Sequence, residues 1–142
     1  MLRYLSILLL ALFSLSGCDS LGDDDAPPAP QSVAGVWEGT IAHSNPDFNG
    51  QLSLTITQID RAVTGTARWT YGLGAGGRTR VVNLSGALIG TVPETGPVTY
   101  TITFDGPVRQ LHDMTLDAGT LTGTWVSDRS AAINGTSTLT RR

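Results

Sequence analysis

Apolar and polar residues alternate along most of the chain after Ala34, with the two-residue period of a strand that buries one face. The segment QLSLTITQ (51–58) places Leu52, Leu54 and Ile56 on one face and serine or threonine on the other. The β-branched threonines suit the exposed side of a sheet. This pattern predicts eight strands, near 34–42, 50–59, 62–71, 79–90, 97–105, 108–116, 119–127 and 131–140.

Short turn sequences separate these strands, among them DGP at 105–107 and DAG at 117–119. Regular strands with short turns predict an all-β domain over 34–142, an eight-stranded antiparallel up-and-down barrel. The glycine-rich stretch at 72–80 predicts a long flexible loop, serving as a lid or as a contact surface for an anion. The strand near 108–116 alternates poorly, which a β-bulge would explain.

Five glycines fall in mid-strand on the predicted inward face. Glycine weakens a strand, so its repeated use there needs a reason. Inward glycines relieve crowding where a sheet coils sharply, as barrel closure requires. The glycines are Gly39, Gly65, Gly86, Gly123 and Gly135.

The chain begins with a basic residue, Arg3, and an apolar run that ends in small residues, which is the layout of a cleaved signal peptide over 1–17. The run is shorter than the roughly 18 to 20 residues of a membrane-spanning helix. Its end, Leu15-Ser16-Gly17-Cys18, resembles the lipobox of bacterial lipoproteins. The resemblance implies that Cys18 becomes the first mature residue and carries a diacylglyceryl group, with a further acyl chain such as palmitate on its amino group. An ordinary secretory signal that happens to contain a cysteine is the alternative.

Residues 18–33 combine an acidic run with three prolines and lack apolar periodicity, which predicts a disordered tether. Together with this tether, the lipid that the lipobox resemblance implies on Cys18 would make the chain an envelope protein, held on a membrane and facing the periplasm. Asp19 resembles a retention signal of the inner membrane, although this rule varies among bacteria and leaves the choice of membrane open.

The charge balance argues against nucleic acid as a partner. The whole chain has nine basic residues, all arginine, and a formal charge of −3; without Arg3 the mature chain has eight against twelve acids, or −4. Nucleic-acid binding requires a basic patch, and none is evident. Nothing in the sequence indicates an oligomer, so a monomer is the default expectation.

The segments GVWEGT (35–40), VTGTARW (63–69), LTGTWVSD (121–128) and INGTSTLTRR (133–142) resemble strands of lipocalins and avidins, including their Gly-x-Trp signature. The resemblance implies a small-ligand barrel of the calycin type. It does not extend to biotin binding, because Gly39 and Ala67 stand where avidins carry an Asn and a Tyr. Without such polar partners, a buried ureido group would lose its hydrogen bonds.

The large aromatic side chains are the candidate ligand contacts. They share the predicted inward face, where they either line a pocket at the barrel mouth or plug the barrel. The long series of inward aliphatic residues, which includes Leu84 and Ile133, favours the filled interior. The candidates are Trp37, Trp69, Tyr71, Tyr100 and Trp125.

No catalytic arrangement is apparent, so we do not expect an enzyme. His43 and His112, the two histidines, are far apart in sequence, and we expect both in exposed loops. No metal or cofactor is expected. The leading hypothesis is therefore a lipid-anchored envelope protein that binds a small apolar ligand or a protein partner. The alternative is a structural or inhibitory module with a filled barrel and no internal ligand.

Overall fold

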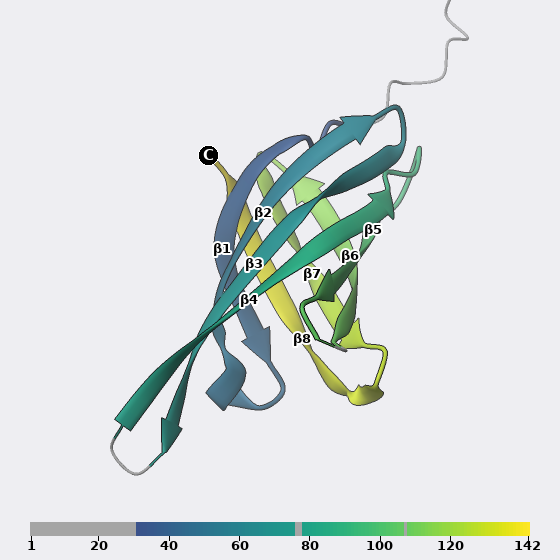
Figure 1. Cartoon of the computed structure of the whole chain (residues 1–142). Helices are drawn as coiled ribbons and strands as arrows, with labels where there is room; N and C mark the ends of the chain where they lie inside the picture. The colour runs from purple at the N-terminus through teal and green to yellow at the C-terminus, as the bar shows by residue number, and fades with distance from the viewer. Residues whose placement is uncertain (1–30, 76–77, 107) are drawn as a thin grey trace, which may run out of the picture.

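The computed structural model describes residues 31–75, 78–106 and 108–142, and these form a closed barrel of eight antiparallel strands. Each strand pairs with the next along the chain, and β8 closes the sheet against β1 (Figure 1). The predicted all-β up-and-down barrel is confirmed. The predicted signal peptide and most of the predicted tether, residues 1–30, lie outside the described residues. The strands are β1 (Gly35–His43), β2 (Gly50–Ile59), β3 (Ala62–Ala75), β4 (Arg78–Thr91), β5 (Val98–Phe104), β6 (Arg109–Asp117), β7 (Thr120–Ser127) and β8 (Ser130–Arg141).

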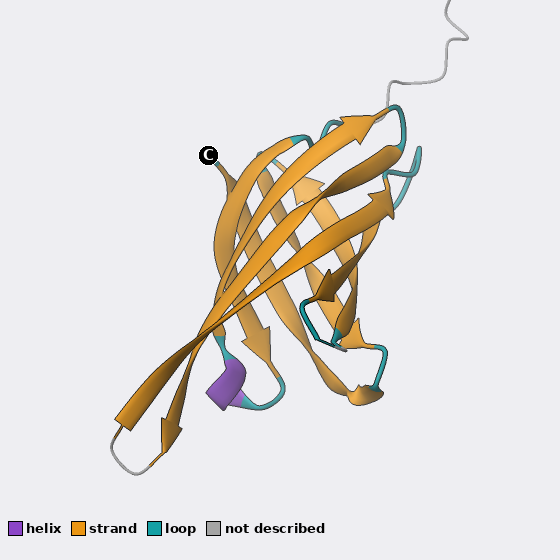
Figure 2. Cartoon of the chain, in the orientation of Figure 1, coloured by secondary structure: helices purple, strands orange, loops and turns teal. Residues whose placement is uncertain are grey.

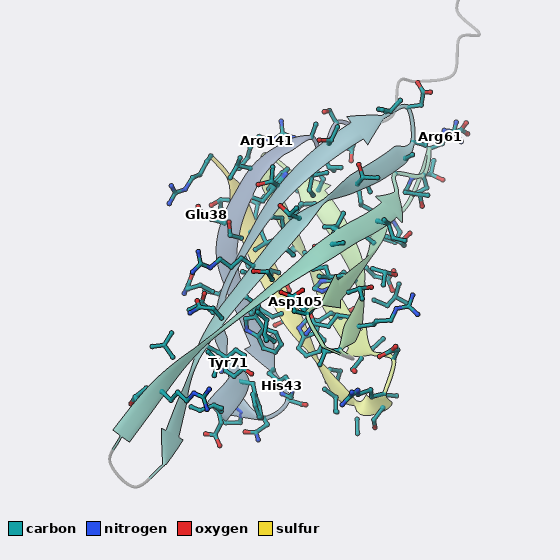
Figure 3. All side chains as sticks on the ribbon, in the orientation of Figure 1. Glu38, His43, Arg61, Tyr71, Asp105 and Arg141 are labelled. Carbon is teal, nitrogen blue, oxygen red and sulfur yellow. The ribbon has the colours of Figure 1, made fainter. Side chains whose placement is uncertain are left out.

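The two ends of the barrel are built differently. One end carries the β1–β2 connection with the 3-10 turn η1 (Pro46–Phe48), and the hairpin connections β3–β4, β5–β6 and β7–β8 (Figure 2). We call this the open end. The other end, which we call the base, receives the chain at Gln31 and also carries the carboxyl terminus. Figure 3 shows His43 and Tyr71 toward the open end, with Arg61 and Arg141 toward the base.

Trp37 closes the base. Its side chain has no solvent exposure, and its indole Nε1–H donates to the carbonyl of Val33 at 2.8 Å. The Arg141 guanidinium lies over the ring, 4.8 Å from its centroid, in a cation–π arrangement. Val33 is itself fully buried, and its N–H donates to Gln58 Oε1. The segment before β1 is thereby fixed as a plug over the base.

Inward glycines let neighbouring strands approach closely. A Cβ on Gly123 would lie 1.9 Å from the carbonyl oxygen of Asp113, and one on Gly135 would lie 1.8 Å from that of Ala42. No side chain fits at such distances, so any residue other than glycine would force these strands apart. Gly39, Gly65 and Gly86 show the same close approach. The predicted role of these glycines in sheet curvature agrees with this geometry.

The prediction of a flexible loop over 72–80 is wrong for most of that range. β3 continues to Ala75 and β4 begins at Arg78, so the two strands form a long hairpin. β3 and β4 extend beyond their other neighbours at the open end, because β2 pairs with β3 only up to Tyr71 and β5 pairs with β4 only from Gly86 (Figure 1). Gly72 and Gly74 are exposed in this hairpin, and the hairpin needs few side-chain contacts at these positions.

The poor alternation of apolar and polar residues near 108–116 does not come from a β-bulge in β6, as the sequence suggested. β6 pairs in continuous register with both β5 and β7, and the register shift lies instead between Val126 and Ser127 of β7. The alternation is obscured because polar residues occupy inward positions: Gln110 is 1 % exposed and His112 is 0 % exposed. The expectation that His112 lies in an exposed loop is therefore wrong.

Candidate functional site

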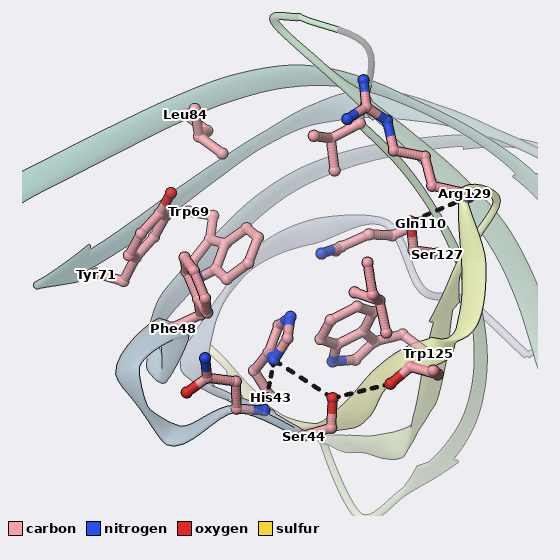
Figure 4. Close-up of a pocket in the computed structure, with 14 residues that line it drawn as sticks. His43, Ser44, Phe48, Trp69, Tyr71, Leu84, Gln110, Trp125, Ser127 and Arg129 are labelled. Atoms are coloured by element: carbon pink, nitrogen blue, oxygen red, sulfur yellow. Dashed lines mark hydrogen bonds between the residues drawn. The ribbon is translucent and has the colours of Figure 1, made fainter. Parts of the chain in front are cut away.

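A cavity of about 440 Å³ opens at the open end of the barrel (Figure 4). This volume lies within the range of small-molecule sites. Its apolar lining comes from Phe48, Trp69, Tyr71, Leu84, Val108, Trp125, Ala132 and Ile133, and its polar lining from His43, Ser44, Asn45, Gln110, Ser127 and Arg129. The barrel is therefore hollow at one end, while a continuous core of buried side chains fills the rest.

Aromatic rings form one continuous part of the cavity wall. Trp69 lies at the centre of this group, with its ring centroid 4.8 Å from that of Tyr71 and 6.2 Å from that of Trp125. Phe48, from the turn η1, meets Tyr71 edge to face at 5.5 Å. These are ordinary separations for packed aromatic pairs, so the rings hold one another in place. The wall offers flat, rigid apolar surface to a molecule that enters.

His43 lies at the end of β1, where its ring packs 5.1 Å from Phe48 and 5.2 Å from Trp125. The backbone N–H of Asn45 donates to Nδ1 at 2.8 Å. Burial lowers the pKa of His43 below its usual value. Because Nδ1 acts as an acceptor, the neutral ring carries its proton on Nε2. The expectation that His43 lies in an exposed loop is therefore wrong, because its side chain is half-buried in the cavity wall.

Gln110 and His112 form a buried polar pair on β6. Their Oε1 and Nε2 atoms lie 3.1 Å apart. Burial lowers the pKa of His112 to about 3, so the ring is neutral at ordinary pH. Its other nitrogen, Nδ1, is buried without a hydrogen-bond partner among the described residues. On the neighbouring strand β5, Tyr100 stacks on His112 with ring centroids 4.8 Å apart, and burial raises the pKa of the Tyr100 hydroxyl.

The structure brings three of the five predicted aromatic residues together at the cavity: Trp69, Tyr71 and Trp125. The other two lie elsewhere, Trp37 at the base and Tyr100 in the core beside His112. The predicted lipidation site, Cys18, lies outside the described residues.

Sequence reasoning missed three further residues of the wall as candidate contacts. His43 lies just before the turn sequence NPDFNG (45–50) and Phe48 lies within it, where turn residues indicate a connection between strands and give no sign of a ligand contact. Gln110 was overlooked because a polar residue in an inward position breaks the alternation. The one available signal was that irregularity itself, since polar residues that replace apolar ones on a core face need a partner.

Comparison with known proteins supplies no family for the chain. No protein-family model matches the sequence, and no curated protein matches it either. Across the part of the chain that the structure describes, no helix has the length and hydrophobicity needed to cross a bilayer. Nor do three or more His, Cys, Asp or Glu side chains gather there in a way that suits a metal ion. The candidate site is thus defined by its own geometry.

His112 makes stability depend on pH. Its pKa is about 3 in the fold against 6.5 for a free histidine, so the unfolded chain binds more protons between these values. The stabilisation is complete above about pH 6.5 and is lost as the pH falls. We expect the free energy of unfolding to drop by about 2 kcal/mol between pH 8 and pH 5 through this residue alone.

Urea unfolding of the wild type and of His112→Phe across this pH range measures the effect. The carboxylates titrate in both proteins, so the difference between the two curves isolates the histidine. The wild type should lose more stability than the variant on acidification. Equal losses in the two proteins would show that His112 is not held neutral in the core.

Proposed function

We propose that the barrel binds a small, flat, largely apolar molecule in the cavity at its open end. The observation that carries this proposal is the hollow itself, walled by Trp69, Tyr71, Trp125 and Phe48. A barrel of eight strands has room for filling side chains or for one small ligand, and here the filling stops short of the open end.

The structural or inhibitory module remains the alternative, but a filled barrel would not explain this aromatic-walled space. The sequence resemblance to lipocalins and avidins also supports ligand binding, because barrels of that type hold small molecules at one end.

We also propose that lipid on Cys18 holds the barrel to a bacterial membrane, with the barrel in the periplasm. Two or more acyl chains anchor a protein stably, whereas one holds it only marginally. The described chain enters at the base, where Gln58 Nε2 donates to the Gln31 carbonyl at 3.3 Å. The cavity therefore opens at the end of the barrel opposite the tether, which leaves it accessible to ligand from the periplasm.

Blocking the cavity should abolish binding of an apolar probe. Leu84 lines the cavity beside Trp69, its partner on the neighbouring strand, and Leu84→Trp would fill part of the space. We expect wild-type protein to enhance the fluorescence of N-phenyl-1-naphthylamine saturably, and the variant to bind it at least about tenfold more weakly, as expected from loss of the apolar contact area.

Val81→Trp is the matched control, because Val81 lies on the same strand but is 62 % exposed. It adds the same ring outside the barrel and should leave the affinity unchanged. Absence of saturable binding by the wild type, or equal affinities in both variants, would count against the cavity as a binding site.

The anchor is tested by Cys18→Ser in a bacterial host. The substitution removes the thiol that would carry the diacylglyceryl group, so we expect the protein to move from the membrane fraction to the soluble fraction. Immunoblots of the two fractions, and metabolic labelling with palmitate, measure this. Membrane association and normal processing of the variant would refute lipidation at Cys18.

A further inference from the structure

The Gln110 side chain presents a hydrogen-bond donor to the cavity. It is 1 % exposed overall, it lines the cavity, and its amide end points into the hollow (Figure 4). Its Oε1 is engaged with His112 Nε2 at 3.1 Å, and its Nε2 has no hydrogen bond to any described residue. An amide NH₂ group in an apolar pocket is costly without an acceptor, which a ligand would supply.

His112 sets the orientation of this amide. With Nε2–H donating to Gln110 Oε1, the His112 ring leaves an unfilled acceptor at Nδ1, which is buried without a partner. The opposite amide orientation would require the proton on Nδ1 and would leave a buried N–H without an acceptor. In proteins, buried N–H groups without an acceptor are rarer than buried acceptors without a donor. The first arrangement is therefore favoured, and it directs the Gln110 NH₂ toward the cavity.

A second donor faces the same space. Asn45 N–H occupies Nδ1 of His43, so the proton of the neutral ring lies on Nε2. Figure 4 shows the Gln110 amide and the His43 ring reaching toward each other across the hollow. Among the described residues, neither Asp nor Glu lines the cavity, and Arg129 is the charged residue that does. The side-chain oxygens of Asn45 and Ser127 already accept from backbone N–H groups. Gln110 and His43 therefore present donors to the hollow.

We propose that the ligand carries an oxygen acceptor, a carbonyl or a carboxylate, on its flat apolar body, and that Gln110 Nε2 donates to this oxygen. His43 Nε2–H is placed to donate to the same group. This inference rests on the proposed function, since it names the chemistry of the molecule bound in that cavity. Ligands without an acceptor leave the Gln110 amide desolvated and unpaired, so the site selects against them.

Three probes with one ring system test the selectivity. 2-Ethylnaphthalene has no acceptor, 2-acetylnaphthalene has a neutral carbonyl of similar size, and 2-naphthoate has a carboxylate. Equilibrium dialysis against the wild-type protein gives the three affinities. We expect 2-acetylnaphthalene or 2-naphthoate to bind about five- to tenfold more tightly than 2-ethylnaphthalene, as one net hydrogen bond implies. The tighter of the two acceptor probes identifies which source of oxygen the site prefers.

Gln110→Leu should remove the preference and retain binding of 2-ethylnaphthalene. Since this change leaves the His112 N–H unpaired, the double variant Gln110→Leu/His112→Phe replaces both partners by apolar groups, which better preserves the fold. Gln51→Leu is the control, because Gln51 is exposed on the outside of the barrel and the preference should persist.

The outcomes separate the two proposals. If all three probes bind and the ratios of their affinities are the same in the wild type as in the Gln110→Leu and double variants, the proposed binding function is retained and the acceptor proposal is overturned. If none of the probes binds, the proposed function fails, and the acceptor proposal fails with it. A preference that is present in the wild type and in Gln51→Leu, but lost in the variants at position 110, establishes the proposal.

Discussion

Closure of the sheet is the constraint on which the rest of the molecule depends. β1 must hydrogen-bond to β8, and a sheet of only eight strands reaches that closure only if its strands coil strongly. Strong coiling brings backbone carbonyls of neighbouring strands to where an inward Cβ would stand, as at Gly123 and Gly135. The inward glycines follow from this requirement. They also remove side-chain volume from the interior, so the remaining inward residues decide which end is filled.

The two ends of the interior use different chemistry. At the base, Val33, Trp37 and Arg141 close the barrel with apolar contact, one hydrogen bond and a cation–π contact. Toward the open end, the interior changes to aromatic rings with the polar pair Gln110 and His112 between them. Apolar residues at these positions would avoid the desolvation cost of buried polar groups, which the pair offsets only in part because His112 Nδ1 has no partner among the described residues. Of the two, Gln110 lines the hollow and His112 holds its amide from behind, an arrangement that the proposed ligand contact of Gln110 would use.

The sequence predicted the architecture well because the two-residue period directly records which face of each strand is buried. The eight strands and the inward glycines follow from that period and from turn chemistry. The pattern failed where the interior is polar, because Gln110 and His112 look like surface residues by composition. It also failed at the β3–β4 hairpin, where glycines indicated a loop although cross-strand pairing continues. The cavity itself arises from side chains that meet only in three dimensions, such as His43 with Trp125.

The central claim is that ligand enters the open end and leaves the base untouched, and the three tryptophans report on both places. Trp69 and Trp125 line the cavity, while Trp37 is buried at the base. A titration of ¹⁵N-labelled protein with 2-acetylnaphthalene, followed by the three indole N–H resonances in ¹H–¹⁵N spectra, tests this claim most directly. Saturable shifts of the Trp69 and Trp125 resonances, with that of Trp37 unchanged, are the predicted result. Three unchanged resonances, or a shift confined to Trp37, would contradict the claim.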